Sequence, residues 1–488
     1  MNTRRTLAAI CCFLVATPAM AQFGGAGGVI VDPDGVLRFD SSKGRTAKRE
    51  LSGIRTGKET PPSALRQVSL KGLDRELRRA LEKGDEIPDN VKNVAGLTTV
   101  DYVQFVPETK DIVLIGRGES PGEVGGRAVG LTTGRPMLQL EDLVAALRCV
   151  LDGPGQVSCS IDPRRSGLAA AQEASNVTKI PRNSREERDL AQKVSDALGL
   201  QTTVTSGVPD GSRFARLMLE ADYLMKRMAM GDEKVRGITS HLDVLTDLNE
   251  QGKLSTTLAR WWFTPDYKPF DRNKEGTLVK FNGPGLKLLN EAVMVDAQGN
   301  KRGTGKASAD WDRFSQSFTA ALPYLESRYP AFADLHNLFD LMMVAALIQK
   351  VGDADWLQGS ALLDPSIYKV PREAQPSHAE PVVTTRRHTK RDGRDRFHMV
   401  TIAYGGVSMN PSAALSAAYP EPSIFPGDAD VASADAAVAR SAGSLISQAD
   451  TPFASADPRQ IAETNDAQFW ADSPLPLDSI PPMAPPEE

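Results

Sequence analysis

The chain lacks several features by which common classes of protein are recognised. After its first residues it has no uninterrupted run of about 18 apolar residues, the length that a membrane span needs. It has no excess of positive charge, since the net charge is −5 with 24% charged residues, and this argues against nucleic-acid binding. No H-E-x-x-H sequence occurs, so the usual zinc-protease helix is absent. We therefore expect no nucleic-acid partner, and no transmembrane segment once the N-terminal signal peptide described next has been cleaved.

The N-terminus is typical of a secretory signal peptide. Arg4 and Arg5 form a charged start, Leu7 to Ala16 form a short apolar run, and residues 19–21, Ala-Met-Ala, fit the small-x-small cleavage rule. We expect residues 1–21 to be removed and the rest to be exported from a bacterial cytoplasm, as a periplasmic or secreted protein.

Cysteine is scarce, with four in the whole chain, and cleavage would remove two of them. Cys149 and Cys159 would remain in an oxidising compartment, where a disulfide can persist. Cys149 ends a predicted helix and Cys159 lies in the next predicted strand, so a bridge across the DGPGQ turn is geometrically possible. The alternative is a pair of buried thiols.

Composition and periodicity divide the rest of the chain into five parts. Residues 22–62 predict a hairpin around Asp-Pro-Asp-Gly, followed by a polar linker. Residues 63–232 alternate strands and helices, which is typical of an α/β domain with a mixed sheet. Residues 233–355 predict an α+β domain, in which an antiparallel meander is followed by two helices. Residues 356–408 combine a basic linker with a late strand, and residues 409–488, rich in Ala, Ser, Pro and Asp, are expected to be disordered.

The stretch SGVPDGSRFARLMLEADYLMKRMAMG, residues 206–231, predicts one strong helix. Its apolar side chains recur every 3.6 residues, so one face is expected to pack into a core. Charged pairs four residues apart are expected on the opposite face: Arg216 with Glu220, and Asp222 with Lys226. Met225 and Met228 could hold a soft metal ion. Methionine is also a common filler of irregular cores, however, and we predict no metal site.

Four stretches together resemble a known family. They are VDYVQFVPETKDIVLIGRGE, GRAVGLTTGRPMLQLEDLVAALR, CSIDP and GVPDGSRFARLMLEADYLMKRMAMG. In this order they resemble exported planctomycete proteins of domain-of-unknown-function family 1598, over roughly residues 97–350 and a late GGV strand. The resemblance implies export and a similar architecture. The family has no assigned activity, cofactor or catalytic residue, so the resemblance implies no mechanism.

Charged side chains follow several predicted strands. In open α/β sheets, ligands bind beyond the carboxyl ends of parallel strands. If the strands here are parallel neighbours, one crevice would gather six side chains: Arg117, Glu119, Arg135, Asp162, Asp210 and Arg213. These are the catalytic candidates for a hydrolase of unrecognised type. The simpler interpretation is that they are solvated loop charges and helix caps.

Aromatic side chains are concentrated in ARWWFTPDYKPF, residues 259–270. Adjacent residues on a strand point to opposite faces of its sheet, so one of the two neighbouring tryptophans is expected in the core and the other, Trp262, outside. Trp262 and Tyr267 are therefore binding candidates, suited to sugar rings or to an apolar patch on a partner. The alternative is that both rings pack within the protein.

Three further patterns resemble functional sites but have simpler interpretations. DAQGNKRGTGKAS (296–308) imitates a phosphate-binding loop, but it lacks one required glycine and the final Ser or Thr. His336 and Asp340 lie one helical turn apart, yet no third metal ligand is near them in sequence, so a packed histidine is favoured. The basic run 384–398 is interpreted as a solvated linker, with attraction to an anionic polymer or envelope surface as the alternative.

These patterns favour a non-catalytic exported protein over an enzyme. We expect no cofactor, and a partner that is either another protein or a component of the cell envelope. The alternative is the hydrolase with a strand-end crevice. A deep pocket that unites Asp162, Asp210 and Arg135 would favour the enzyme, whereas an exposed surface around Trp262 would favour binding.

Overall fold

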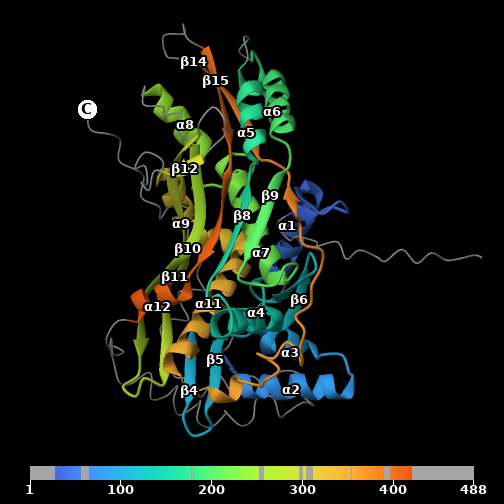
Figure 1. Cartoon of the computed structure of the whole chain (residues 1–488), viewed down its shortest axis with the longest axis vertical. Coiled ribbons are helices and arrows are strands. Elements are labelled where there is room, and N and C mark those ends of the chain that lie inside the picture. The colour runs from blue at the N-terminus through green and yellow to red at the C-terminus, as the bar shows by residue number, and fades with distance from the viewer. Residues whose placement is uncertain are drawn as a thin grey trace, which may run out of the picture.

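A mixed sheet runs along the molecule and pairs strands from distant parts of the chain (Figure 1). The computed structural model describes residues 28–56, 65–176, 179, 181–251, 258–295, 301–303, 312–352, 354–389 and 396–419. The predicted signal peptide (1–21), most of the loop-like sequence at 296–308 and the predicted tail beyond residue 419 lie outside these ranges.

Within the described ranges the main sheet has twelve strands. Its order is β1 (Val29–Val31), β2 (Val36–Phe39), β13 (His378–Ala379), β9 (Gln201–Ser206), β8 (Val157–Asp162), β16 (Tyr404–Met409), β10 (Leu258–Arg272), β11 (Leu278–Val295), β4 (Tyr102–Val106), β5 (Asp111–Arg117) and β3 (Leu65–Ser69), with β12 (Lys301–Gly303) beside β11. Parallel pairing joins β10 to β16 and β2 to β13. The remaining described pairs are antiparallel. The predicted mixed sheet is confirmed.

Strands from both predicted domains pair within this sheet. β4 comes from the predicted α/β part and β11 from the predicted α+β part, and Val103 lies opposite Val279 across them. β16, from the late segment, lies between β8 and β10. One sheet therefore spans the predicted boundary at residue 232.

Helices lie along the sheet and at both ends of the molecule (Figure 1). They are α1 (Ser41–Thr56), α2 (Leu70–Lys83), α3 (Asp89–Lys92), α4 (Leu140–Leu151), α5 (Arg165–Ser175), α6 (Ser184–Leu198), α7 (Arg213–Ala229), α8 (His241–Glu250), α9 (Asp312–Ala320), α10 (Leu322–Arg328), α11 (Pro330–Val351) and α12 (Pro411–Ala418), with 3₁₀ turns η1 (Val94–Gly96) and η2 (Asp355–Leu357). α7 packs on β8 and β16, and α11 packs on α4 and α7. The main core lies between these helices and the sheet.

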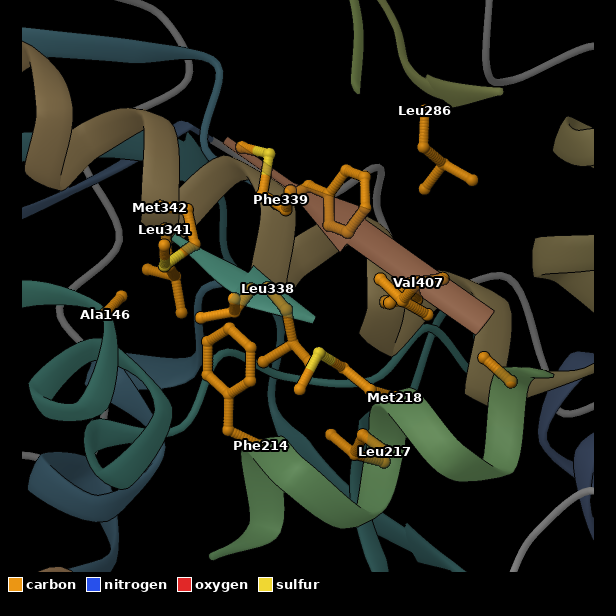
Figure 2. Packing of buried hydrophobic residues seen from close by; sticks show 14 of the residues in the cluster. Ala146, Phe214, Leu217, Met218, Leu286, Leu338, Phe339, Leu341, Met342 and Val407 are labelled. Carbon is orange, nitrogen blue, oxygen red and sulfur yellow. The ribbon is translucent and has the colours of Figure 1, made fainter. Parts of the chain in front are cut away.

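Helix α7 is buried on all sides, which the sequence did not predict. Ser212 caps it by accepting a hydrogen bond from the backbone N–H of Ala215. Figure 2 shows its apolar residues Phe214, Leu217 and Met218 facing α11. Of the two predicted charged pairs, Asp222 with Lys226 is confirmed at 2.7 Å, whereas Arg216 pairs with Glu373 and Glu220 pairs with Arg127. All these residues of α7 are buried, because the helix lies between the sheet and the helices α4 and α11.

Helix α11 is the central helix of the core. Among the described residues it is the helix that is long and apolar enough to cross a membrane, but nearly all of its side chains are buried inside the protein. A helix that is apolar all round belongs either in a membrane or in the middle of a large core. The burial of α11 identifies it as a core helix.

Two segments predicted to be irregular contain helices. The predicted linker after the N-terminal hairpin forms α1, whose Ala47 and Leu51 are buried against Val124 and Val129. The predicted tail from residue 409 begins with α12, which packs on β10 and α11. Low apolar content misled the prediction in both cases, because a few residues at helical spacing are enough when a docking surface is present.

The predicted meander differs in its turns. The sequence NGPG, residues 282–285, is typical of a turn, but it lies inside the long strand β11, where Gly283 has φ +103° and Gly285 has φ +75°. Glycine at such φ values forms a bulge here rather than a turn, and the register with β10 shifts nearby. The expected helix at 309–328 divides into α9 and α10, because Pro323 lacks the N–H that would continue the first helix.

Two hairpins lie beside the main sheet within the described residues. They are β6 (Pro121–Val124) with β7 (Arg127–Gly130), and β14 (Val383–Thr389) with β15 (Arg396–Ile402). The second hairpin replaces the predicted basic linker and lies with α5 and α6 at one end of the molecule (Figure 1). The single late strand predicted over 397–407 is divided between β15 and β16.

The core position of α7 gives a direct test. Leu217→Ala and Met225→Ala should each lower the free energy of unfolding by about 2–5 kcal/mol, because both side chains are fully buried. Met225→Leu should change it little, since volume and apolarity are kept. Urea denaturation of the wild type and the three variants measures these free energies of unfolding. If Cu(I) stabilises the wild type and Met225→Leu abolishes that effect, the core interpretation of Met225 is wrong.

Candidate functional site

The side chains expected to meet in a strand-end crevice do not converge. The expectation required parallel strands, but β8 and β9 are antiparallel. Asp162 lies opposite Thr202 at one end of this pair, and Asp210 follows the strand end at which Ser206 lies opposite Ser158. Four residues of strand separate the two ends, or about 13 Å. The two carboxylates therefore lie at opposite ends of the strand pair and do not meet at one strand end.

The remaining candidates have structural partners. Glu119 is buried, and its carboxylate accepts hydrogen bonds from the backbone N–H groups of Thr132 and Thr133 and from the Thr133 hydroxyl, which fixes the loop before α4. Asp210 accepts a hydrogen bond from the Thr205 hydroxyl at 2.9 Å. Arg117 ends β5. These contacts agree with the cap and loop interpretation.

Arg213 belongs to a buried network of charges that joins the helices to a hairpin. Asp334 of α11 forms ion pairs with Arg213 of α7, at 2.7 Å, and with Arg127 of β7. Arg127 also pairs with Glu220 of α7, and Arg213 also pairs with Asp142 of α4. All five side chains are at most 14% exposed.

The network holds more carboxylates than guanidinium groups. Burial raises the pKa of Asp142 to about 7, although the charge of Arg213 opposes the shift. Burial also raises the pKa of Glu220, against the charge of Arg127. Each carboxylate is paired with an arginine and buried, so the network connects elements of the fold and is closed to a substrate.

Arg135 lies in a second cluster, around His336. Its guanidinium pairs with Glu326 at 2.6 Å, and His336 Nδ1 lies 2.8 Å from the same carboxylate. On the other side, His336 Nε2 lies 3.8 Å from Asp340, which accepts a hydrogen bond from the Tyr267 hydroxyl at 2.7 Å. The cluster ties α10 and α11 to β10 and to the loop before α4.

Tyr267 is partly buried and held by contacts within the protein. Its ring contacts Phe270 and Phe281, and its hydroxyl is bonded to Asp340. The prediction of a packed histidine agrees with the enclosure of His336 between two carboxylates. Within the described part of the chain, no group of three or more His, Cys, Asp or Glu residues could hold a metal ion.

Two short catalytic patterns occur in the sequence, but neither has the required structural context. G-x-S-x-G at residues 118–122 would place its serine between a strand and a helix in a nucleophile elbow. Ser120 instead lies exposed between strands β5 and β6. S-x-x-K occurs at Ser366 and Lys369, in an exposed turn where the Ser366 hydroxyl donates to Asp364.

Cys149 and Cys159 are separate buried thiols in this structure. Burial raises the pKa of Cys149 to about 11, and burial also raises the pKa of Cys159 well above its ordinary value. A thiol with a raised pKa is a poor nucleophile, so neither cysteine is a catalytic candidate.

Trp262 lies on the face of the sheet opposite the core. Its neighbour Trp261 is fully buried and contacts His241 and Phe314, whereas Trp262 is partly exposed. The expected division between one inner and one outer tryptophan is what the structure shows. Strand register places a row of five outer-face residues side by side across β11, β10, β16, β8 and β9: Leu289, Trp262, Gly406, Ser160 and Val204.

Four residues of this row, Trp262, Gly406, Ser160 and Val204, line a trough, which we name the outer-face trough. It has a volume of about 390 Å³ and is lined by Ser158, Cys159, Ser160, Val204, Arg260, Trp262, Glu291, Gly406, Val407 and Ser408. Trp262 and Val204, which is 54% exposed, form its two sides. Three strand spacings, or about 14 Å, separate their strands.

The floor of the trough is low because its central residues are small. A Cβ atom at Gly406 would lie 1.9 Å from the carbonyl oxygen of Cys159, so only glycine fits there. From the core side, the Lys226 ammonium donates hydrogen bonds to the carbonyl oxygens of Ile161, at 2.9 Å, and Gly405, at 3.4 Å. Its charge is balanced by Asp222 at 2.7 Å. The floor is thus fixed from below.

One end of the trough carries opposite charges. Arg260 and Glu291 lie directly opposite each other on β10 and β11. The Arg260 guanidinium lies 5.7 Å from the centre of the Trp262 ring, within range of a cation–π contact. The other end carries the hydroxyls of Ser158 and Ser408, which are neighbours across β8 and β16. Sequence reasoning found Trp262, but it missed these residues because only strand register brings them together.

Fold and geometry thus describe an α/β protein with an open trough on the free face of its sheet. Residues 159–241 match the model of a family described as a protein of unknown function (DUF1598). The matched segment runs from β8 through α7 to the first residue of α8 and supports the family that the sequence resembles. No curated protein matches the chain, and no solved structure matches it.

The His336 cluster predicts a pH dependence of stability. Burial lowers the pKa of His336, but the carboxylates of Glu326 and Asp340 outweigh burial and raise it. A raised pKa in the folded state means that the stabilisation is fully present below the unfolded value of about 6.5 and is lost as the pH rises through the folded pKa.

The wild type should therefore exceed His336→Gln in free energy of unfolding most clearly near pH 6, and the difference should shrink toward pH 9. Urea denaturation at several pH values measures it. A difference that stays constant over this range would show that the imidazole is not charged in the folded protein.

Proposed function

We propose that this protein is an exported, non-catalytic binding protein that attaches to a component of the cell envelope through the outer-face trough. The observation that carries the proposal is the position of Trp262, a partly exposed aromatic ring beside an open, small-residue floor. Tryptophan is among the residue types that commonly supply most of the energy of a binding interface.

The distribution of charged groups supports binding over catalysis. The acidic candidates Asp162 and Asp210 are at opposite ends of an antiparallel pair, and Arg213 and Arg135 are occupied by buried carboxylates. General acid–base catalysis needs a titratable group within reach of the substrate proton. Nothing in these positions favours the hydrolase alternative.

Export rests on the N-terminal sequence, in which a charged start, an apolar run and Ala-Met-Ala precede residue 22. An exported protein meets envelope polymers directly. Because the trough is open, a polymer chain longer than the trough can lie in it. Protein recovered from the exported fraction should begin at Gln22, and a retained Met1 would contradict export.

The binding proposal is tested by co-sedimentation of the purified mature protein with washed envelope fragments. Wild-type protein should bind saturably, and Trp262→Ala should weaken binding by about tenfold or more, because truncation of an aromatic anchor costs about 2 kcal/mol or more. Trp262 is outside the core, so its replacement should leave the melting temperature nearly unchanged.

Tyr324→Ala is the matched control. Tyr324 is also an exposed aromatic residue, at 41%, but it lies on α10 and outside the trough. The Tyr324→Ala variant should bind envelope fragments like the wild type. Equal binding by the wild type and Trp262→Ala, or equal loss in both variants, would contradict the assignment of the trough as the binding site.

A further inference from the structure

We infer that the ligand of the outer-face trough is a neutral oligosaccharide, with one sugar ring stacked on Trp262. This inference rests on the proposed binding function and adds the chemical class of the ligand. It follows from the ring contact, the hydrogen-bonding groups, the charges and the size that the trough offers to a ligand.

The ring contact is supplied by Trp262 and its neighbour across the strands. Leu289 lies directly opposite Trp262 and is 37% exposed, so an apolar surface continues from the indole onto β11. A sugar ring has one face of C–H groups, which removes apolar area from water when it lies on an aromatic face. The hydroxyl groups of the same ring point outward and need polar partners at the edge of the indole.

Those partners are present on both sides of the ring position. Arg260 is a hydrogen-bond donor and Glu291 an acceptor at one end of the trough, and Ser158, Ser160 and Ser408 can donate or accept at the floor and the other end. A sugar hydroxyl also both donates and accepts. An aliphatic or aromatic ligand could form no hydrogen bonds with these groups.

The charges in the trough oppose each other. One positive group, Arg260, faces one negative group, Glu291, across the strands. Sites for phosphate, sulfate or carboxylate ligands instead concentrate arginine, lysine or backbone N–H donors. Because the lining has no excess of either sign, charge complementarity selects a neutral ligand over an anionic polymer.

The shape of the trough selects a chain. It is open rather than enclosed, and the distance between the strands of Trp262 and Val204 is about 14 Å, more than one sugar ring spans. Gly406 and Ser160 keep the floor low between them. A linear oligosaccharide can lie across β10, β16, β8 and β9 without a change in the sheet.

An array of immobilised oligosaccharides tests the inference. It should contain neutral glucose, mannose and N-acetylglucosamine oligomers, together with sulfated and uronic-acid oligomers. The mature protein should bind members of the neutral set. Trp262→Ala should lower the signal by about tenfold or more, Trp262→Tyr should retain part of it because a ring remains, and Glu291→Gln should weaken it several-fold.

The control and the contrary outcomes separate this inference from the proposed function. Tyr324→Ala should bind the array like the wild type. Binding to anionic members alone, binding to no glycan, or neutral binding that survives Trp262→Ala would each overturn the inference. If envelope fragments are still bound through Trp262 in such a case, the proposed function stands and only the ligand class is wrong.

Discussion

The two ion pairs of Asp334 are the contacts on which the arrangement of the helices depends. This one carboxylate of α11 binds Arg213 of α7 and Arg127 of β7, and those arginines continue to α4 and back to α7. Charges so deeply buried are costly when unpaired, so the four elements can come together only in an arrangement that satisfies all of them. The network selects the packing of the helix layer, while the apolar contacts shown in Figure 2 supply most of its stability.

The helix layer on one face of the sheet leaves the other face available. Helix α7 contributes to the helix packing and also to the trough. Its residues Arg213 and Glu220 belong to the buried network, and its Lys226 donates hydrogen bonds to the carbonyl oxygens of Ile161 and Gly405. The strands β8 and β16 are thereby fixed under the floor of the trough. A rigid floor suits binding, because little conformational freedom is lost when a ligand docks on a surface that is already ordered.

Periodicity and turn residues predicted much of the fold, because they act locally. The mixed sheet, the apolar face of α7 and the opposite orientations of Trp261 and Trp262 could all be read from spacing along the chain. Strand order and direction could not, since β10 pairs with β16 more than a hundred residues away. The prediction of a strand-end crevice failed for this reason, and the trough was missed because its lining comes from five strands. The burial of Glu220 and Lys226 also escaped prediction, because a charged residue at a helical position is usually solvent-exposed.

The free energy of unfolding of Asp334→Asn tests the central claim most directly. Asparagine offers one acceptor oxygen and turns N–H donors toward a second guanidinium, so the variant should lose about 3–5 kcal/mol in urea denaturation. Asp247→Asn is the matched control: its pair with Arg313 at 2.8 Å is 44% and 40% exposed, and the loss should be under about 1 kcal/mol. Equal, small losses in both variants would contradict the view that the Asp334 network determines the packing of the helices.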